Sequence, residues 1–162
     1  MHHNYWKGLI LKMNNLLEER LTLLANCFIK CDFNDLFPYL AKDVVWESNW
    51  VMQPRVGYDV VVNYYKTKAK QFKTSSWHTY HTLVKTLEPK LSGLNSKNGR
   101  VMLYHEKDIL LDYVKQISDK GEISYSIIEL KLNEEGLITR IDMCMPELFS
   151  FEKYKVINSN LN

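Results

Sequence analysis

Four side chains in this sequence have the chemistry for proton transfer: His78, His81, Tyr113 and Asp142. Imidazole titrates near neutral pH, so a histidine beside a phenol or a carboxylate could act as general acid or base on a small organic substrate. The two histidines are three residues apart in a strand-like segment, so we expect them on opposite faces of a sheet, with at most one reaching an interior. A lone histidine on a strand also has a purely structural interpretation, and both interpretations stay open.

The cysteines point away from disulfides and from metals. Cys27, Cys31 and Cys144 form an odd, sparse set, which favours a reducing compartment over a disulfide framework. Cys27 and Cys31 could share a helix face, but no Cys-x-x-Cys pair or histidine cluster accompanies them. We therefore expect no metal and no cofactor. We also expect a cytoplasmic protein, because no apolar run matches a membrane span or a signal-peptide core.

Length and charge restrict the class of partner. The chain has 162 residues, which fits one domain, and 46% of them are hydrophobic. Its net charge of +2 comes from 21 basic and 19 acidic residues. This near-neutral balance argues against nucleic acid or a membrane as a bulk partner.

The first third of the chain predicts helices and one strand. Leu17, Leu21, Leu24 and Phe28 recur at helical spacing and predict an amphipathic helix over 15–30. Residues 1–13 are expected to form an N-terminal arm. Asp32 is placed to cap a short second helix that holds Pro38 in its first turn. A strand over 44–51 and a helix over 58–72 should follow.

The rest of the chain alternates as strands do. The expected strands cover 77–88, 100–106, 109–117, 123–133 and 137–145, with a loop over 89–99. One domain should extend over 14–154, followed by a tail over 155–162. Helices followed by strands are typical of an α+β fold. We expect a curved antiparallel sheet wrapped around the N-terminal helices as a cone with an internal cavity.

Short motifs in this order resemble the nuclear transport factor 2-like superfamily, the SnoaL-like or cystatin-like α+β cone. The segments that carry the resemblance are Lys30-Cys-Asp-Phe-Asn-Asp35, Leu40-Ala-Lys-Asp-Val-Val-Trp-Glu47, Gly57-Tyr-Asp-Val-Val-Val-Asn-Tyr-Tyr65 and Asn133-Glu-Glu-Gly-Leu-Ile-Thr-Arg-Ile141. The superfamily contains isomerases, dehydratases, epoxide hydrolases, polyketide cyclases and non-catalytic modules, so the fold alone does not define an activity.

The resemblance places neutral residues where family enzymes carry acids. Ser48 stands at the base position of ketosteroid isomerases, and Leu24 and Ile128 stand where a tyrosine and a protonated carboxyl hold the oxyanion, a case that serves as a standard example of pKa tuning. In epoxide hydrolases and cyclases the acid lies on the last strand. Here Met143 takes that position and Asp142 precedes it, so we expect Asp142 to point away from the cavity unless a bulge turns it inward.

The predicted pocket is mostly apolar and has a few polar groups, as small-molecule sites do. Its expected lining is Trp46, Ser48, Trp50, Tyr65, Leu111, Tyr113, Ile128 and Leu130. The same aromatic side chains could instead simply fill the cone.

The outer face of the sheet is predicted to carry Glu47 and Glu129 together with Ile123, Tyr125 and Ile127. An apolar stripe on an outer face needs a cover, so we expect a homodimer through this face. Three functions remain open. They are a module that binds a small apolar or aromatic molecule, a small-substrate enzyme with an unusual His, Tyr and Asp set, and a protein-interaction module.

Overall fold

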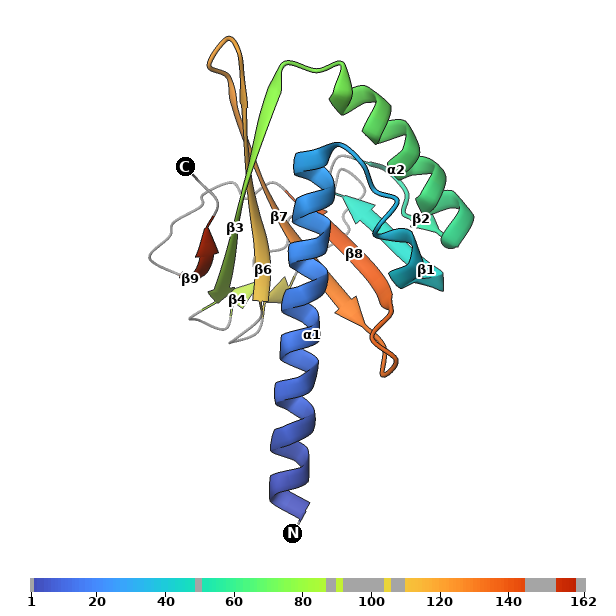
Figure 1. Ribbon diagram of the computed structural model, residues 1–162, viewed down its shortest axis with the longest axis vertical. Coiled ribbons are helices and arrows are strands. Elements are labelled where there is room, and N and C mark those ends of the chain that lie inside the picture. Colours follow the sequence, from blue (N-terminus) through green and yellow to red (C-terminus); the bar gives the residue numbers. More distant parts are fainter. Residues whose placement is uncertain are drawn as a thin grey trace.

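The computed structural model describes residues 2–48, 51–86, 90–91, 104–105, 110–144 and 154–159. Helix α1 crosses one face of a curved sheet, and a second helix, α2, flanks the sheet at one end (Figure 1). This arrangement is the expected α+β architecture.

Helix α1 spans His2–Lys30 and includes most of the predicted N-terminal arm. Its second half buries the predicted apolar stripe, and Leu21 and Leu24 are fully buried. Its first half projects beyond the sheet (Figure 1), and there Leu9 and Leu11 are 41% and 63% exposed. The arm is therefore a helical extension rather than a separate irregular segment.

The chain leaves α1 through a left-handed turn. Cys31 has a φ of 53°, and the backbone N–H of Asp32 donates to the Cys27 carbonyl at 3.0 Å. These two features are typical of the Schellman end of a helix. The predicted short second helix is a single 3-10 turn, η1 (Phe37–Tyr39), with Pro38 in its first turn, where the missing N–H is not needed.

The remaining elements follow the predicted order. They are β1 (Leu40–Ser48), β2 (Arg55–Val56), α2 (Tyr58–Lys73), β3 (Trp77–Thr86), β4 (Lys90–Leu91), β5 (Tyr104–His105), β6 (Leu110–Ser118), β7 (Ile123–Leu132), β8 (Ile138–Cys144) and β9 (Tyr154–Ser159).

The main sheet has seven strands in the order β2-β1-β8-β7-β6-β3-β9. Strand β1 pairs with β8 in parallel, whereas the other neighbours are antiparallel. The curved sheet of the expected α+β fold is therefore mixed, with antiparallel pairing between all neighbours except β1 and β8. Strand direction at this pair depends on the long path between β1 and β8, which no local pattern encodes.

The C-terminal segment also differs from its prediction. Residues expected in a tail form β9, which pairs with β3 at the edge of the sheet. Polar and charged residues are common on edge strands, so the composition of this segment resembled that of a tail. Within the predicted loop, β4 pairs with β5 in a separate two-stranded sheet.

The core lies between the two helices and the sheet. It joins Leu21 and Leu24 of α1 to Val61 of α2 and Ile141 of β8, each at most 1% exposed. Burial of apolar surface on this scale is the main force that holds helices on a sheet. The same core fixes which strand residues point inward, and so it defines the candidate site.

Candidate functional site

The register of the strands separates an inner from an outer face. Directly paired residues on neighbouring strands point to the same side of a sheet. Trp46 pairs with Ile141, which pairs with Leu130, and all three belong to the core. This row marks the inner face, toward α1 and α2.

The predicted pocket aromatics pack against one another at one end of the inner face. The rings of Trp46 and Tyr64 are 4.3 Å apart between centroids, and Tyr65 stacks on Phe33 at 4.5 Å. The Trp46 side chain hydrogen-bonds Tyr65, so one predicted polar group already has a partner within the core. Arg55 lies over both Trp46 and Tyr64, at 4.8 and 4.3 Å from the ring centroids.

Both tyrosines are held neutral. Burial raises the pKa of Tyr65 well above its ordinary value and raises that of Tyr64 to about 12, although Arg55 opposes the latter shift. A phenol that stays protonated at physiological pH can donate a hydrogen bond but cannot serve as a base.

The structure brings the positions of the family's acids into one inner region. Ser48 pairs with Met143, and Met143 pairs with Ile128, so these three residues form a row across β1, β8 and β7. Ser48 and Ile128 are each 1% exposed. Leu24 of α1 belongs to the same core cluster as Ile128. None of these four side chains can exchange a proton near neutral pH.

The inner face becomes polar toward the turn between β6 and β7. His81 pairs with Val114, and Val114 pairs with Ser126. His81 and Ser126 are 3% and 4% exposed. The His81 ring lies 5.8 Å from the Phe28 ring of α1, and Phe28 lies 5.8 Å from Phe72 of α2. A titratable ring is therefore placed beside aromatic side chains from both helices.

One row further toward the turn, three half-buried polar residues lie side by side. Thr79 pairs with Gln116, and Gln116 pairs with Ser124. The Gln116 amide donates to the Thr79 hydroxyl at 3.2 Å. We call the two rows together the inner polar patch, consisting of Thr79, His81, Gln116, Ser124 and Ser126.

Tyr113 lies on the outer face, contrary to its predicted place in the pocket. It pairs with Ile127, which alternates with the inward Ile128, and its ring stacks on Tyr125 at 5.7 Å. Its neighbour Val114 points inward instead. The prediction failed by one residue in register, which reverses every side chain of a strand. The side chain of Leu111 and all of Trp50 lie outside the described part of the structure.

The four candidates for proton transfer do not come together. His81 points inward, whereas His78 lies on the opposite face, exposed, with its Nε2 atom 2.9 Å from Asp119. This outcome confirms the expectation that at most one histidine reaches the interior. Asp142 shares its face with Glu47 and Glu129, so it points away from the interior as expected.

Asp142 belongs to a buried ion cluster that consists of Arg140, Asp142 and Glu47. The Arg140 Nε atom donates to both carboxylate oxygens of Asp142, at 2.9 and 2.8 Å, and an Arg140 terminal nitrogen donates to Glu47. Glu129 pairs in register with Asp142. All three carboxylate residues on these neighbouring strands are buried: Glu47 is 7% exposed, Asp142 is 2% exposed and Glu129 is 7% exposed.

Burial and pairing act on this ion cluster in opposite directions. Burial raises the pKa of Asp142, and hydrogen bonding and attraction from Arg140 oppose that rise. Burial likewise opposes the charge of Arg140, yet Asp142 and Glu47 together raise its pKa. The cluster is therefore a structural ion network in which one arginine is shared by two carboxylates.

The outer face is already well covered in a single chain. Ile127 and Tyr113 are 1% and 3% exposed, and of the predicted apolar stripe Ile123 alone exceeds half exposure, at 52%. A homodimer through this face stays a prediction, and the exposure of its described residues does not favour it.

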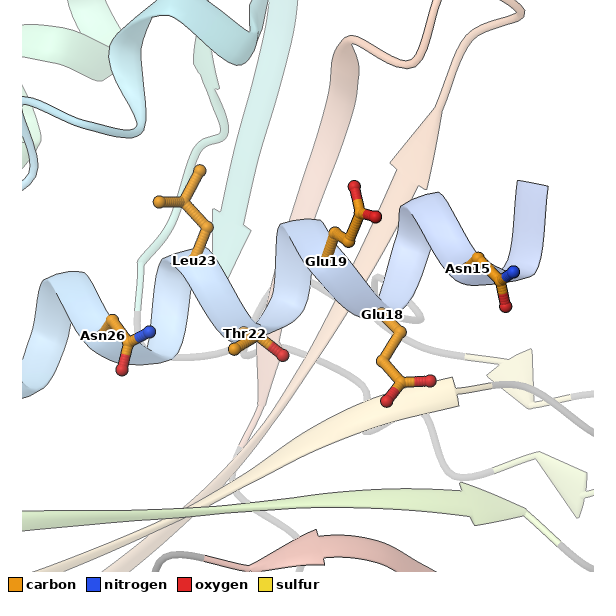
Figure 2. A pocket seen from close by; sticks show the side chains of 6 residues that line it. All are labelled: Asn15, Glu18, Glu19, Thr22, Leu23 and Asn26. Atoms are coloured by element: carbon orange, nitrogen blue, oxygen red, sulfur yellow. The ribbon is translucent and has the colours of Figure 1, made fainter. Parts of the chain in front are cut away.

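A pocket of about 570 Å³ lies elsewhere, along α1. Its lining is Asn15, Glu18, Glu19, Thr22, Leu23 and Asn26, all on that helix (Figure 2). None of the predicted pocket residues contributes to it. Glu18 and Glu19 point to opposite flanks of the helix and do not form a catalytic pair, but they give this surface a negative character.

The described residues also include two of the cysteines and both helices. Cys27 is buried, and burial raises its pKa to about 11, so it is a thiol rather than a reactive thiolate at neutral pH. No group of three or more potential metal ligands occurs among the described residues. In that same part of the chain, no helix has both the length and the apolar character needed to cross a membrane.

Comparison with known proteins identifies the fold. The sequence matches no family model and no curated protein. An NTF2-like protein of unknown function from Exiguobacterium sp. 255-15 superposes with a TM-score of 0.51, at 12% identity over 82% of this chain and 99% of that one. A candidate polyketide cyclase from Xanthomonas campestris pv. campestris gives 0.50, at 11% identity over 86% and 94%. The chain has the nuclear transport factor 2-like, or cystatin-like, fold.

Sequence reasoning missed two features of the site. The inner polar patch depends on the register of β3, β6 and β7, although the alternation of Ser124 and Ser126 with Ile123, Tyr125 and Ile127 was a usable signal. Arg140 was visible beside Asp142, but its bond to Glu47 joins residues 93 positions apart in the chain. Only the parallel pairing of β1 with β8 brings them together.

Proposed function

We propose that this protein is a module that binds a small, largely apolar or aromatic molecule on the inner face of its cone, without acid–base catalysis. The observation that carries the proposal is the row of Ser48, Met143 and Ile128. These residues occupy the positions where the resemblance to family enzymes puts acids, and they lie together on the inner face. A site with this lining can hold an apolar molecule but cannot move a proton through these groups.

The inner polar patch supplies the orienting groups of the proposed site. Its buried hydroxyl and imidazole, on Ser126 and His81, lie within an otherwise apolar surface, and Phe28 borders His81. This combination suits a flat ring system with one hydroxyl, carbonyl or carboxyl group. The ligand would place its polar group toward Ser126 and its rings beside the aromatic side chains that border His81.

A thermal-shift screen with apolar acids, sterols and aromatic lactones tests the proposal. A ligand present at a hundredfold excess over its dissociation constant should stabilise the fold by about 2.7 kcal/mol. Ser126→Val should lower the affinity for that ligand about tenfold, because one buried hydrogen bond is lost. Thr82→Val is the matched control, since Thr82 is also a buried strand hydroxyl but pairs with the outward Tyr113.

Two results would contradict this function. One is a chemically altered ligand, detected by NMR after incubation with the protein, because it would reveal catalysis. The other is an equal loss of affinity in Ser126→Val and Thr82→Val, because a ligand bound on the inner face should depend more on Ser126 than on Thr82.

A further inference from the structure

The first half of α1 and the pocket on its second half carry opposite charges. In the arm, which we define as residues 2–13, the charged residues other than histidine are Lys7 and Lys12, both of which are exposed. No acidic residue occurs before Glu18. The pocket contains Glu18 and Glu19. Figure 2 shows these two carboxylates on opposite flanks of the helix.

The two lysines lie on the same flanks as the two glutamates. Lys12 precedes Glu19 by seven residues, which is two helical turns with an angular offset of about 20°. Lys7 precedes Glu18 by eleven residues, which is close to three turns. Each flank of α1 therefore carries one basic residue in the arm and one acidic residue beside the pocket.

These charges cannot neutralise one another within one helix. Side chains on a helix pair across three or four residues, and none of the four has an opposite charge at that spacing. Lys7 and Glu18 are separated by about 16 Å along the helix axis. None of the ion pairs within the described residues involves Lys7, Lys12, Glu18 or Glu19.

We propose that two copies of this chain pair through antiparallel α1 helices, each arm lying over the pocket of the other copy. A two-fold axis perpendicular to the paired helices keeps each flank opposite the same flank of the partner. Lys12 then faces Glu19 of the second copy, and Lys7 faces Glu18. With the two helices aligned in one register, the two residues of each pair lie within about one helical turn of each other along the axis. A lysine side chain can span that distance.

The surface between the two flanks fits such a contact. Leu11 is 63% exposed and lies one turn before Asn15 on the pocket side of the helix. Exposed Gly8 lies one turn before Leu11 on the same side and has no heavy atom within 4 Å of the position a Cβ would take. Small residues allow two helices to approach closely, and pairing would remove Leu11 from water.

Charge reversal tests the pairing in the full-length chain. Sedimentation equilibrium in low salt should give twice the chain mass of 19.2 kDa. The double variant Lys7→Glu with Lys12→Glu, and separately Glu18→Lys with Glu19→Lys, should each raise the dimer dissociation constant at least about tenfold, because like charges then face each other. An equimolar mixture of the two variants should restore a dimer of wild-type affinity or better.

Restoration of the dimer in the mixture of the two variants would assign the contact to the charges on α1. Lys66→Glu with Lys70→Glu changes the charge equally on the exposed side of α2 and should leave the dimer unchanged. Circular dichroism checks that every variant stays folded. A monomeric wild type would overturn the proposal, and so would a dimer that survives both reversals. Binding of the monomer to phosphatidylcholine vesicles containing phosphatidylserine, lost in the lysine variant, would overturn it in favour of a lipid surface.

Discussion

Arg140 shows how much can depend on one side chain. It is the shared cation between Glu47 and Asp142, whose side chains are only 9% and 3% exposed. Removing one member of a buried ion network leaves the others charged without compensation, which costs more than the network contributed.

We expect Arg140→Leu to lower the free energy of unfolding by about 3 kcal/mol at pH 7. This value is near the lower end of the cost of breaking a buried ion pair, because the arginine itself is only half-buried. Urea denaturation measures this loss. Lys131→Leu is the control, since Lys131 is exposed and pairs directly with Arg140 on the neighbouring strand. A comparable loss in the control would mean that any cation on this face is equivalent.

The loss should depend on pH with a defined sign. The pKa of Asp142 lies above its ordinary value of 3.8, so this carboxyl favours folding below that pH and the contribution is lost as pH rises through the folded pKa. Without Arg140 the pKa should rise further. The deficit of Arg140→Leu should therefore shrink as pH falls from 7 toward 4, and a constant deficit would contradict the ion-cluster interpretation.

Sequence reasoning placed some of these side chains on the correct face of the sheet and others on the wrong face. The opposite faces of His78 and His81 followed from two-residue alternation. The outward position of Asp142 followed from the same alternation together with the family resemblance that puts Met143 at the acid position. Tyr113 was misplaced because the start of β6 could not be fixed by sequence, and a shift of one residue reverses the face. Burial of the acidic row was also unforeseen, because it depends on strands that are distant in the chain.

Among the elements, the β7–β8 hairpin is tied to α1 by close packing. Gly136 has a φ of 78°, and its carbonyl accepts a hydrogen bond from Arg20 of α1 at 3.2 Å. A methyl group added at Gly136 would overlap the Cδ2 atom of Leu16 and stand 3.4 Å from its Cγ. A side chain at this position would therefore adopt a strained positive φ and would also have to displace the Leu16 side chain.

Gly136→Ala should destabilise the fold by about 2–4 kcal/mol, combining backbone strain with the clash against α1. Gly121→Ala is a matched control, because Gly121 has a φ of 80° and nothing within 4 Å of the added atom. It should lose only about 1 kcal/mol. Thermal denaturation of both variants separates the two costs, and equal losses would exclude a role for Leu16.

Local patterns located most elements because each has a short-range cause. The apolar stripe of α1, the proline in η1 and the turn glycines each act within a few residues. The edge strand β9 has no such signal, and neither does the direction of β1 beside β8. Pairing partners are a property of the complete sheet, which a local pattern does not contain.

For the whole molecule, the arm should contribute little to the stability of the domain. Lys7, Leu9 and Leu11 are exposed and belong to the first half of α1. That half of the helix extends beyond the sheet (Figure 1). At a protein concentration at which the chain is monomeric, removing residues 1–11 should therefore lower the midpoint of thermal unfolding by less than about 4 °C, equivalent to about 1 kcal/mol. A drop beyond about 10 °C in a calorimetric scan would show that the arm packs on the domain.

The parallel pair of β1 and β8 has a consequence during synthesis on the ribosome. Leu40 pairs with Ile138, so β1 must wait until the strands between them have been translated before β8 can join it. Until then, an apolar strand edge is open to other nascent chains, a situation that favours aggregation. Formation of this pair is therefore a late step in folding, and yield in the cell should depend on how well chaperones shield Leu40–Ser48 in the interval.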